Sequence, residues 1–272
     1  MNDRNSPPVT LTIAGVDPSG GAGVLADVRT FAAFGCFPTT VITSLTFQNT
    51  TGVVGAQHQT PDVIRAQMLP LVADFQIAAA KTGMLPNTEV IQEVARLFRD
   101  LPLPAPVVDP VMQATSGDSL IDDEAVGTLI RNLVPLACLV TPNVPEAERL
   151  TGLEIGDLNT MREAARKIRR LGAPAVLVKG GHLTAEAEAI DVLDREGQVT
   201  IFRGEMLQGG QVHGSGCVLS SAIAAGLAHG RTLEDAVSRA KDYVTRLIRE
   251  SPAIGHGARP LFRTESNFNP RS

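Results

Sequence analysis

Apolar, β-rich stretches alternate with helical patterns along most of this 272-residue chain. Each stretch is almost continuously apolar, which is typical of parallel strands covered on both faces rather than of strands with one exposed face. Strands that alternate with helices predict an α/β fold, a doubly wound sheet with helices on both of its faces. The apolar stretches occupy residues 9–16, 39–48, 77–84, 106–112, 138–143 and 175–181.

Helix starts can be located from local residues. A threonine followed by a first-turn proline predicts a helix over 61–75. Thr160 stands three residues before Glu163, which predicts a capping box at the start of a helix over 160–171. Thr232 precedes a long amphipathic segment and is expected to cap it.

Residues 191–207 differ from the other segments, because two short strands flank a Glu-Gly turn. This pattern predicts a hairpin at an edge of the sheet. No linker, repeat or change of composition divides the chain. We therefore expect one domain over 1–272, with flexible tails at 1–8 and 260–272.

Composition argues against several classes of function. A net charge of −5, with no Trp and one Tyr, speaks against a nucleic-acid binder, which needs basic patches and stacking aromatics. No apolar run approaches the roughly 20 residues that span a bilayer, and the polar N-terminus is not a secretory signal. The three cysteines cannot form a complete disulfide set and have no paired metal spacing. We expect a reduced, cytoplasmic protein with neither nucleic-acid nor membrane partners.

Polar residues and glycines gather where the expected strands end. A doubly wound sheet binds its ligands at the carboxyl ends of its strands, so this repetition predicts one site for a small-molecule substrate along that edge. The residues are Asp17 to Gly23, Gln48 and Asn49, Lys81 to Met84, Asp109, Asn143, and Lys179 to His182.

The first glycine loop, GVDPSGGAGVLAD at residues 15–27, has three interpretations. Gly15 and Gly20 have the spacing of a P-loop, but the lysine and hydroxyl residues that should follow are missing. A dinucleotide fingerprint starts at Gly21, but no acid at the end of the second strand is present to hold a ribose. We favour a third interpretation, in which the glycines let a polar substrate approach the backbone at a helix N-terminus. A plain tight turn would explain one or two of these glycines, not four in nine residues.

The second glycine loop, Gly214-Ser215-Gly216-Cys217, opens an apolar helix rich in small residues. The first N–H groups of a helix are unpaired and carry the positive end of its dipole, and the glycines let an anion approach them. We therefore expect an anion hole here. Close packing of a buried helix would explain the alanines but not the turn.

A thiol at a helix start is expected to have a lowered pKa, so Cys217 is a candidate base, with a buried inert cysteine as the alternative.

Two other strand ends carry groups suited to a metal and to phosphates. Asn143 and Glu146 lie on one face of a helical turn, where their oxygens suit a hydrated Mg²⁺. The same two residues also make an ordinary helix start. Lys179 can neutralise a phosphate, although a single lysine at a strand end is usually just solvated.

The chain resembles the hydroxymethylpyrimidine/phosphomethylpyrimidine kinases of thiamine biosynthesis, members of the ribokinase-like superfamily, over about residues 9–257. The resemblance implies a three-layer α/β/α fold with a mostly parallel central sheet, and a homodimer. It also implies an ATP- and Mg²⁺-dependent enzyme that phosphorylates 4-amino-5-hydroxymethyl-2-methylpyrimidine and then its monophosphate. The motifs that carry it are, in chain order, LTIAGVDPSGGAGVLADVRTF, VITSLTFQNT, KTGML, VVDPVM with SGD, TPNVPEAERL, VLVKGGH and HGSGC.

The resemblance assigns roles to individual residues, and the chemistry agrees with them. Phosphoryl transfer depends mainly on positioning and charge neutralisation, which backbone N–H groups, Mg²⁺ and a lysine supply. A glutamine amide combines a donor with an acceptor, which matches the ring nitrogens and amino group of an aminopyrimidine. The implied residues are Gln48, Asp27, Gly15 and Met84 for the pyrimidine, Glu146 and Asp109 for the metal, Asn143, Lys179 and Ser215 for the nucleotide, and Cys217, Gly214, Gly216 and Lys179 for catalysis.

Two positions depart from the family pattern. Val212 stands where these kinases often carry threonine, which removes a hydroxyl near the phosphates, and Thr115 stands where they often carry lysine, which removes a charge near the substrate. Two loops that contain glycine, 113–120 and 204–212, are candidates to close over the site.

Three other functions compete with this one. Related kinases with the same loops phosphorylate B6 vitamers, so a pyridoxal or pyridoxine kinase is the main alternative. A sugar kinase of the superfamily would carry an aspartate in place of Cys217. A non-catalytic regulator that binds a pyrimidine or a nucleotide would need no anion hole for a transferred phosphate.

Overall fold

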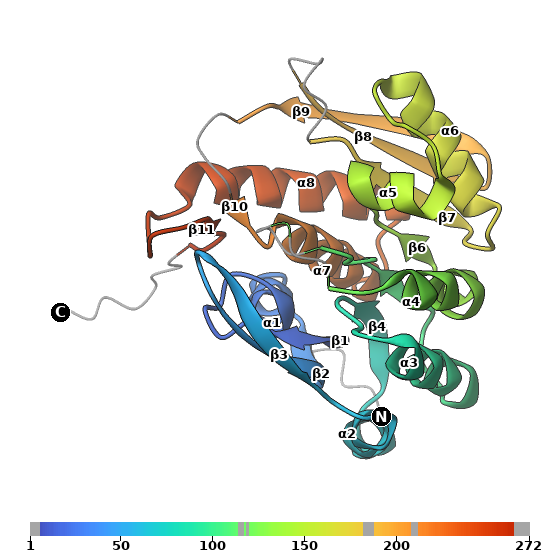
Figure 1. Cartoon of the computed structure of the whole chain (residues 1–272), viewed down its shortest axis with the longest axis vertical. Helices are drawn as coiled ribbons and strands as arrows, with labels where there is room; N and C mark the ends of the chain where they lie inside the picture. Colours follow the sequence, from blue (N-terminus) through green and yellow to red (C-terminus); the bar gives the residue numbers. More distant parts are fainter. Residues whose placement is uncertain (1–5, 114–116, 118–119, 182–187, 208–211, 264–272) are drawn as a thin grey trace.

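The computed structural model describes residues 6–113, 117, 120–181, 188–207 and 212–263. Thr115 and parts of both candidate lid loops lie outside these residues. Among the described residues, nine strands form one sheet in the order β3-β2-β1-β4-β5-β6-β7-β8-β9 (Figure 1). The strands are β1 (Val9–Val16), β2 (Phe37–Asn49), β3 (Gly52–His58), β4 (Ile77–Thr82), β5 (Val107–Val108), β6 (Leu139–Val140), β7 (Ala175–Lys179), β8 (Glu188–Arg195) and β9 (Gln198–Glu205).

Helices cover both faces of the sheet, which confirms the expected three-layer α/β/α arrangement (Figure 1). One face carries α1 (Gly23–Ala33), α7 (Ser215–Ala228) and α8 (Leu233–Glu250). The other face carries α2 (Pro61–Asp74), α3 (Thr88–Asp100), α4 (Asp123–Thr128), α5 (Val144–Thr151) and α6 (Leu158–Arg169). No helix in the described part of the chain is both long enough and apolar enough to cross a membrane.

The sheet is parallel from β2 to β7, as its apolar strands predict, and antiparallel at both edges. The hairpin expected within 191–207 is confirmed, because β8 and β9 pair across the Glu196-Gly197 turn. The edge strand β3 was not predicted from the sequence. It pairs with β2 through its backbone and does not bury its apolar side chains, since Val54 is 87% exposed. Strands β5 and β6 are shorter than expected, because prolines shortly after them cannot donate to a sheet.

One predicted helix start is wrong. Helix α6 begins at Leu158 and not at Thr160, because Asp157 caps it one turn earlier. The Asp157 carboxylate accepts from the Thr160 backbone N–H at 2.8 Å, and the Thr160 hydroxyl accepts from the Asp157 N–H at 3.1 Å. Thr160 is therefore the second partner of the capping box. The expected cap of α8 is confirmed, since the Thr232 hydroxyl accepts from the Asp235 N–H.

The expected start of the C-terminal tail also differs from the structure. Instead of starting a tail, Pro260 belongs to a short strand, β11 (Arg259–Pro260), that pairs in parallel with β10 (Val212–His213). Leu261 is only 2% exposed and packs in the same apolar cluster as Cys217. Residues 1–5 and 264–272 lie outside the described residues.

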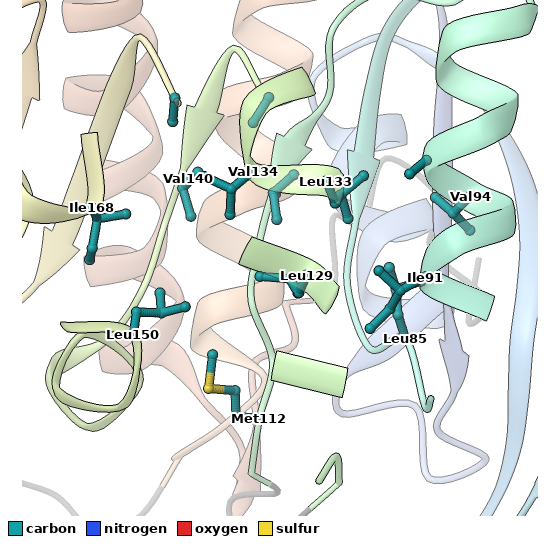
Figure 2. Close-up of a cluster of buried hydrophobic side chains, with 14 of the residues drawn as sticks. Leu85, Ile91, Val94, Met112, Leu129, Leu133, Val134, Val140, Leu150 and Ile168 are labelled. Carbon is teal, nitrogen blue, oxygen red and sulfur yellow. The ribbon is translucent and has the colours of Figure 1, made fainter. Parts of the chain in front are cut away.

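The larger apolar core lies between the sheet and helices α2 to α6, and it fixes the strand ends that matter for function. Figure 2 shows Leu85, just after β4, among the buried side chains of α3 and its neighbours. Met112, which follows β5, lies in the same core and is 1% exposed. Both residues adjoin positions that face the cavity described next, so the core holds that edge of the sheet rigid.

Candidate active site

A cavity of about 750 Å³ opens at the carboxyl ends of the parallel strands and at the N-terminus of α7. Its walls include both glycine loops and the ends of β1, β2, β4 and β7. The site was expected along this edge. Eleven of the predicted site residues line the cavity: Gly15, Gln48, Met84, Asp109, Asn143, Glu146, Lys179, Gly214, Ser215, Gly216 and Cys217.

Asp27 is the predicted site residue that does not line the cavity. Its side chain is completely buried, and both carboxylate oxygens lie within 3.0 Å of Lys81 Nζ. The hydroxyls of Thr12 and Ser221 donate to the same carboxylate at 2.6 and 2.7 Å. With its acceptor positions occupied in this way, Asp27 joins α1, β1, β4 and α7 beneath the site and lies outside the lining of the cavity.

The two glycine loops pack directly against each other. Gly214 has a φ of +83°, and a side chain there would collide with the carbonyl oxygen of Gly21. Gly23 has a φ of +58°, and a side chain there would collide with the carbonyl oxygen of Gly15. Glycine is required at both positions because L side chains rarely adopt this conformation and the space is already filled. The close approach brings the first turn of α1 to the first turn of α7.

Asp17 and His213 reinforce this junction, and sequence reasoning assigned a role to neither. Asp17 Oδ2 lies 2.9 Å from His213 Nε2, and the carboxylate also accepts from the backbone N–H groups of Ser19 and Ala22. Burial acts to raise the pKa of Asp17, but hydrogen bonds from His213, Gln48 and Ser19 outweigh it and hold the pKa below the ordinary value. The only sequence sign of this network is the histidine that opens the HGSGC motif.

Cys217 lies at the start of α7, only 9% exposed. Burial raises the pKa of its thiol to about 11, against the lowering effects of the Lys81 charge and a hydrogen bond from the Gly23 backbone. The expected lowered pKa is therefore wrong, because the loss of solvent outweighs the Lys81 charge and the Gly23 hydrogen bond. The thiol is protonated near neutral pH.

Asp109 and Lys179 meet below the first turn of α7. Lys179 Nζ lies 3.0 Å from Asp109 Oδ1, and a Cβ added to Gly216 would lie 3.1 Å from that Nζ. The absence of a side chain at Gly216 thus brings the helix N-terminus close to a lysine and a carboxylate. Phosphate oxygens bound at this helix terminus would have a cation beside them.

Asn143 and Glu146 form the capping box of α5. The Asn143 side chain accepts from the Glu146 N–H, and the Glu146 carboxylate accepts from the Asn143 N–H, each at 2.8 Å. The ordinary helix-start interpretation therefore holds, and both residues also line the cavity. Burial raises the pKa of Glu146 to about 7, partly offset by Lys179 and reinforced by Asp109.

The described residues contain no group of three or more histidine, cysteine or acidic side chains suited to a metal ion. They do place Asp109 and Glu146 in one cavity, with their charges interacting. Mg²⁺ in phosphoryl-transfer sites is usually held by one or two carboxylates, with waters and substrate phosphates as its other ligands. The donor set therefore fits Mg²⁺ carried by a nucleotide.

Comparison with known proteins agrees with this geometry. The profile of the family described as phosphomethylpyrimidine kinase matches residues 17–262. The hydroxymethylpyrimidine/phosphomethylpyrimidine kinase of Haemophilus influenzae is 42% identical over 253 residues, which cover 92% of this chain and 94% of that protein. The thiamine biosynthesis bifunctional protein ThiED of Geobacter sulfurreducens is 44% identical over 92% of this chain, and the match spans 51% of the bifunctional protein.

Solved structures with the same fold include two kinds of kinase. The phosphomethylpyrimidine kinase of Clostridium difficile 630 superimposes with a TM-score of 0.80 and 40% identity, over 89% of this chain and 99% of that one. A pyridoxal kinase of Bacillus subtilis, in complex with ADP, superimposes with a TM-score of 0.86 and 34% identity, over 94% of this chain and 96% of that one.

Proposed function

Because the chain belongs to the phosphomethylpyrimidine kinase family, we propose that it transfers a phosphoryl group from ATP to 4-amino-5-hydroxymethyl-2-methylpyrimidine and another to the resulting monophosphate. Both reactions serve thiamine biosynthesis. The observation that carries the proposal is the shared cavity, which places the Gln48 amide, the first turn of α7 and the group of Asp109, Glu146 and Lys179 around one space.

The pyrimidine binds in the half of the cavity formed by β1, β2 and the end of β4. Gln48 hydrogen-bonds the ring edge, which presents acceptor nitrogens beside an amino donor. Gly15 leaves room for the flat ring, because a Cβ at this position would lie 3.2 Å from the Met84 sulfur. The hydroxymethyl group then points toward Cys217, whose protonated thiol orients the attacking oxygen.

The triphosphate binds in the other half of the cavity. Lys179 and Asn143 contact its phosphates, and the N–H groups of Ser215, Gly216 and Cys217 hold the group in transfer. Asp109 and Glu146 would hold Mg²⁺, which neutralises charge on the phosphates when it is bound. The hydroxymethyl oxygen forms the new bond to the γ-phosphorus, its proton passes to an oxygen of the transferred phosphoryl group, and ADP leaves with the electron pair of the broken bond.

We also propose that this single-domain chain is a cytoplasmic homodimer that contacts its second copy through β2 and β3. Leu45, Phe47 and Val54 on these strands are 41%, 51% and 87% exposed. Apolar side chains gathered at one edge of a sheet are typical of an interface. Light scattering should give a dimer for the wild type and a monomer for the double variant Phe47→Asp, Val54→Asp.

The experiment that tests the activity supplies the purified chain with ATP, Mg²⁺ and the pyrimidine alcohol. We expect mass spectrometry to detect the monophosphate first and the diphosphate later, and Lys179→Gln to slow the formation of both products.

Pyridoxal, supplied in a parallel assay, tests the alternative suggested by the likeness to a pyridoxal kinase. A kcat/KM for pyridoxal above that for the pyrimidine would make the chain a pyridoxal kinase. If ATP is not consumed with either alcohol, the regulator interpretation holds instead.

A further inference from the structure

Lys241 of α8 forms an ion pair with Asp191 of β8, next to the place where α8 packs against β9 (Figure 1). Its Nζ donates to Asp191 Oδ2 at 2.6 Å and to the Ala189 carbonyl oxygen at 3.1 Å. Gly204 on β9 leaves room for the lysine, since a Cβ added there would lie 3.3 Å from Lys241 Cε. The pair is enclosed, with the two side chains 13% and 10% exposed. Without Lys241, a largely buried carboxylate would lose its compensating charge.

The same carboxylate holds the strand end that carries Lys179. Asp191 Oδ1 accepts from the Gly180 N–H at 3.0 Å, and Asp191 lies opposite Lys179 in the pairing of β7 with β8. A Cβ added to Gly180 would lie 2.2 Å from the Ile190 carbonyl oxygen, so the chain passes β8 in close contact. On the other side, the Lys179 N–H donates to the Pro142 carbonyl oxygen at 2.8 Å. The backbone at Lys179 is therefore held from both sides.

The position of the Lys179 ammonium depends on where this backbone is held. Its Nζ lies 3.0 Å from Asp109 Oδ1 and would lie 3.1 Å from a Cβ added to Gly216 in the first turn of α7. A lysine stem has four flexible carbons, so a shift of the backbone moves the charge away from this narrow place. Lys241 also lines the cavity, but its charge is already paired with Asp191. These contacts favour a role that Lys241 exerts through Lys179 over a separate contact with the nucleotide.

We propose that Lys241 is a positioning residue for phosphoryl transfer, an inference that rests on the proposed function. Through Asp191 and the Gly180 N–H, it keeps Lys179 at the place where the phosphates of ATP bind. Charge stabilisation in such a site depends on cations and donors that are in place before transfer, and a misplacement of about 1 Å can cost on the order of 100-fold in rate. Removal of Lys241 should therefore cost activity only while Lys179 is present to be positioned.

The test is a double-mutant cycle of Lys241→Met with Lys179→Gln, measured as kcat/KM for ATP at a saturating concentration of the alcohol. Lys241→Met alone should lower kcat/KM by about 10- to 100-fold. In the Lys179→Gln background the same substitution should change kcat/KM by less than about twofold, because no ammonium is left to position. Lys241→Arg should recover part of the loss, since a guanidinium keeps the ion pair with Asp191. Arg239→Gln, an exposed arginine of α8 paired with Asp235, is the matched control and should leave kcat/KM unchanged.

A second variant serves if Lys241→Met does not fold because Asp191 is left unpaired. The double substitution Asp191→Asn, Lys241→Met removes both charges, and the asparagine oxygen can still accept from the Gly180 N–H. The link to α8 is lost in this variant too, so its loss of kcat/KM should depend on Lys179 in the same way. An equal loss in both backgrounds, or no loss in the wild-type background, would overturn the inference.

The Kd for ATP, measured by calorimetry without the alcohol, gives the same comparison independently of the phosphate acceptor. We expect Lys241→Met to weaken ATP binding in the wild-type background and to leave it unchanged in the Lys179→Gln background. If this result were obtained and the wild type phosphorylated neither pyrimidine, the proposed function would be overturned while the positioning role of Lys241 would stand.

Discussion

His213 Nε2 lies 2.9 Å from Asp17 Oδ2, and this contact joins two glycine loops that are 196 residues apart in the chain. Next to it, Gly214 packs against Gly21 without space for a side chain. A carboxylate that ties a histidine and two backbone N–H groups together holds both loops in one arrangement. The N-termini of α1 and α7 therefore form a single preorganised wall, which is what stabilisation of a transferred phosphoryl group requires.

The Asp17 contact predicts a loss of stability in acid. The pKa of Asp17 in the folded protein lies below its ordinary value of 3.8, so its contribution is present above that pH and is lost as the pH falls toward the folded pKa. We expect the difference in unfolding free energy between the wild type and Asp17→Asn to shrink from about pH 4 to pH 2. Urea unfolding at several pH values measures this difference. Asp100→Asn, at the exposed end of α3, is the control, and a constant difference for Asp17→Asn would contradict the prediction.

The glycine junction predicts that Gly214→Ala disables the enzyme. A left-handed conformation costs a non-glycine residue roughly 1–2 kcal/mol, and here the new methyl group also collides with Gly21. We expect turnover to fall by about 100-fold or more and the melting temperature to decrease. Gly156→Ala is the matched control, because no atom lies within 4 Å of the added Cβ. Wild-type turnover in Gly214→Ala would show that the loops tolerate separation.

The sequence anticipated those parts of the fold that local patterns determine. Strand β1 matches its apolar stretch to the residue, and the two glycine loops were located from their composition. The features that were missed depend on distant partners. The Asp27 carboxylate is paired with Lys81, 54 residues away, and the backbone N–H groups of His256 and Gly257 donate to Thr50, more than 200 residues away. Neither contact produces a periodic pattern of residues from which it could be predicted.

For Gln48→Leu we predict selective loss of the pyrimidine. A polar ligand edge left unpaired in a closed site costs roughly 1–3 kcal/mol, so the KM for the alcohol should rise by about 5- to 150-fold. The KM for ATP should be unchanged, because Gln48 lies in the substrate half of the cavity. Steady-state kinetics with each substrate varied in turn provide the measurement. Gln92→Leu on the exposed side of α3 is the control, and an equal rise in both KM values would remove Gln48 from the pyrimidine contact.

Glu146→Gln tests the metal role. The glutamine oxygen can still accept from the Asn143 N–H, so the cap of α5 is kept while a negative charge is lost. We expect lower turnover and a higher Mg²⁺ requirement. Since the pKa of Glu146 is about 7, the Mg²⁺ requirement of the wild type should increase from pH 8 to pH 6 as the carboxylate takes up a proton, and that of the variant should not. Glu154→Gln, which is exposed, is the control. Identical Mg²⁺ titrations for Glu146→Gln and the wild type would mean that Glu146 only caps the helix.

Cys217 gives the sharpest prediction, because the structure changes the expected size of the effect. A thiolate that takes the hydroxymethyl proton would make Cys217→Ala about 10²- to 10⁴-fold slower, as for general bases elsewhere. Burial, however, raises the pKa of this thiol to about 11, so thiolate is scarce near neutral pH. A loose, metaphosphate-like transition state is also accelerated little by a general base. We therefore expect Cys217→Ala to lose only about tenfold in kcat, the scale of a positioning effect, and Cys217→Ser to lose less.

The pH–rate profile distinguishes the two roles. If the thiolate were the base, wild-type turnover would rise about tenfold per pH unit from pH 7 to pH 10, because the ionised fraction grows in that proportion below a pKa of about 11. If the thiol only orients the alcohol, the profile should be flat through this range, and the alanine variant should follow it at a lower level. Cys138→Ala removes a thiol outside the cavity and controls for general effects of the substitution. A steep profile together with a loss of 100-fold or more in Cys217→Ala would restore the base role.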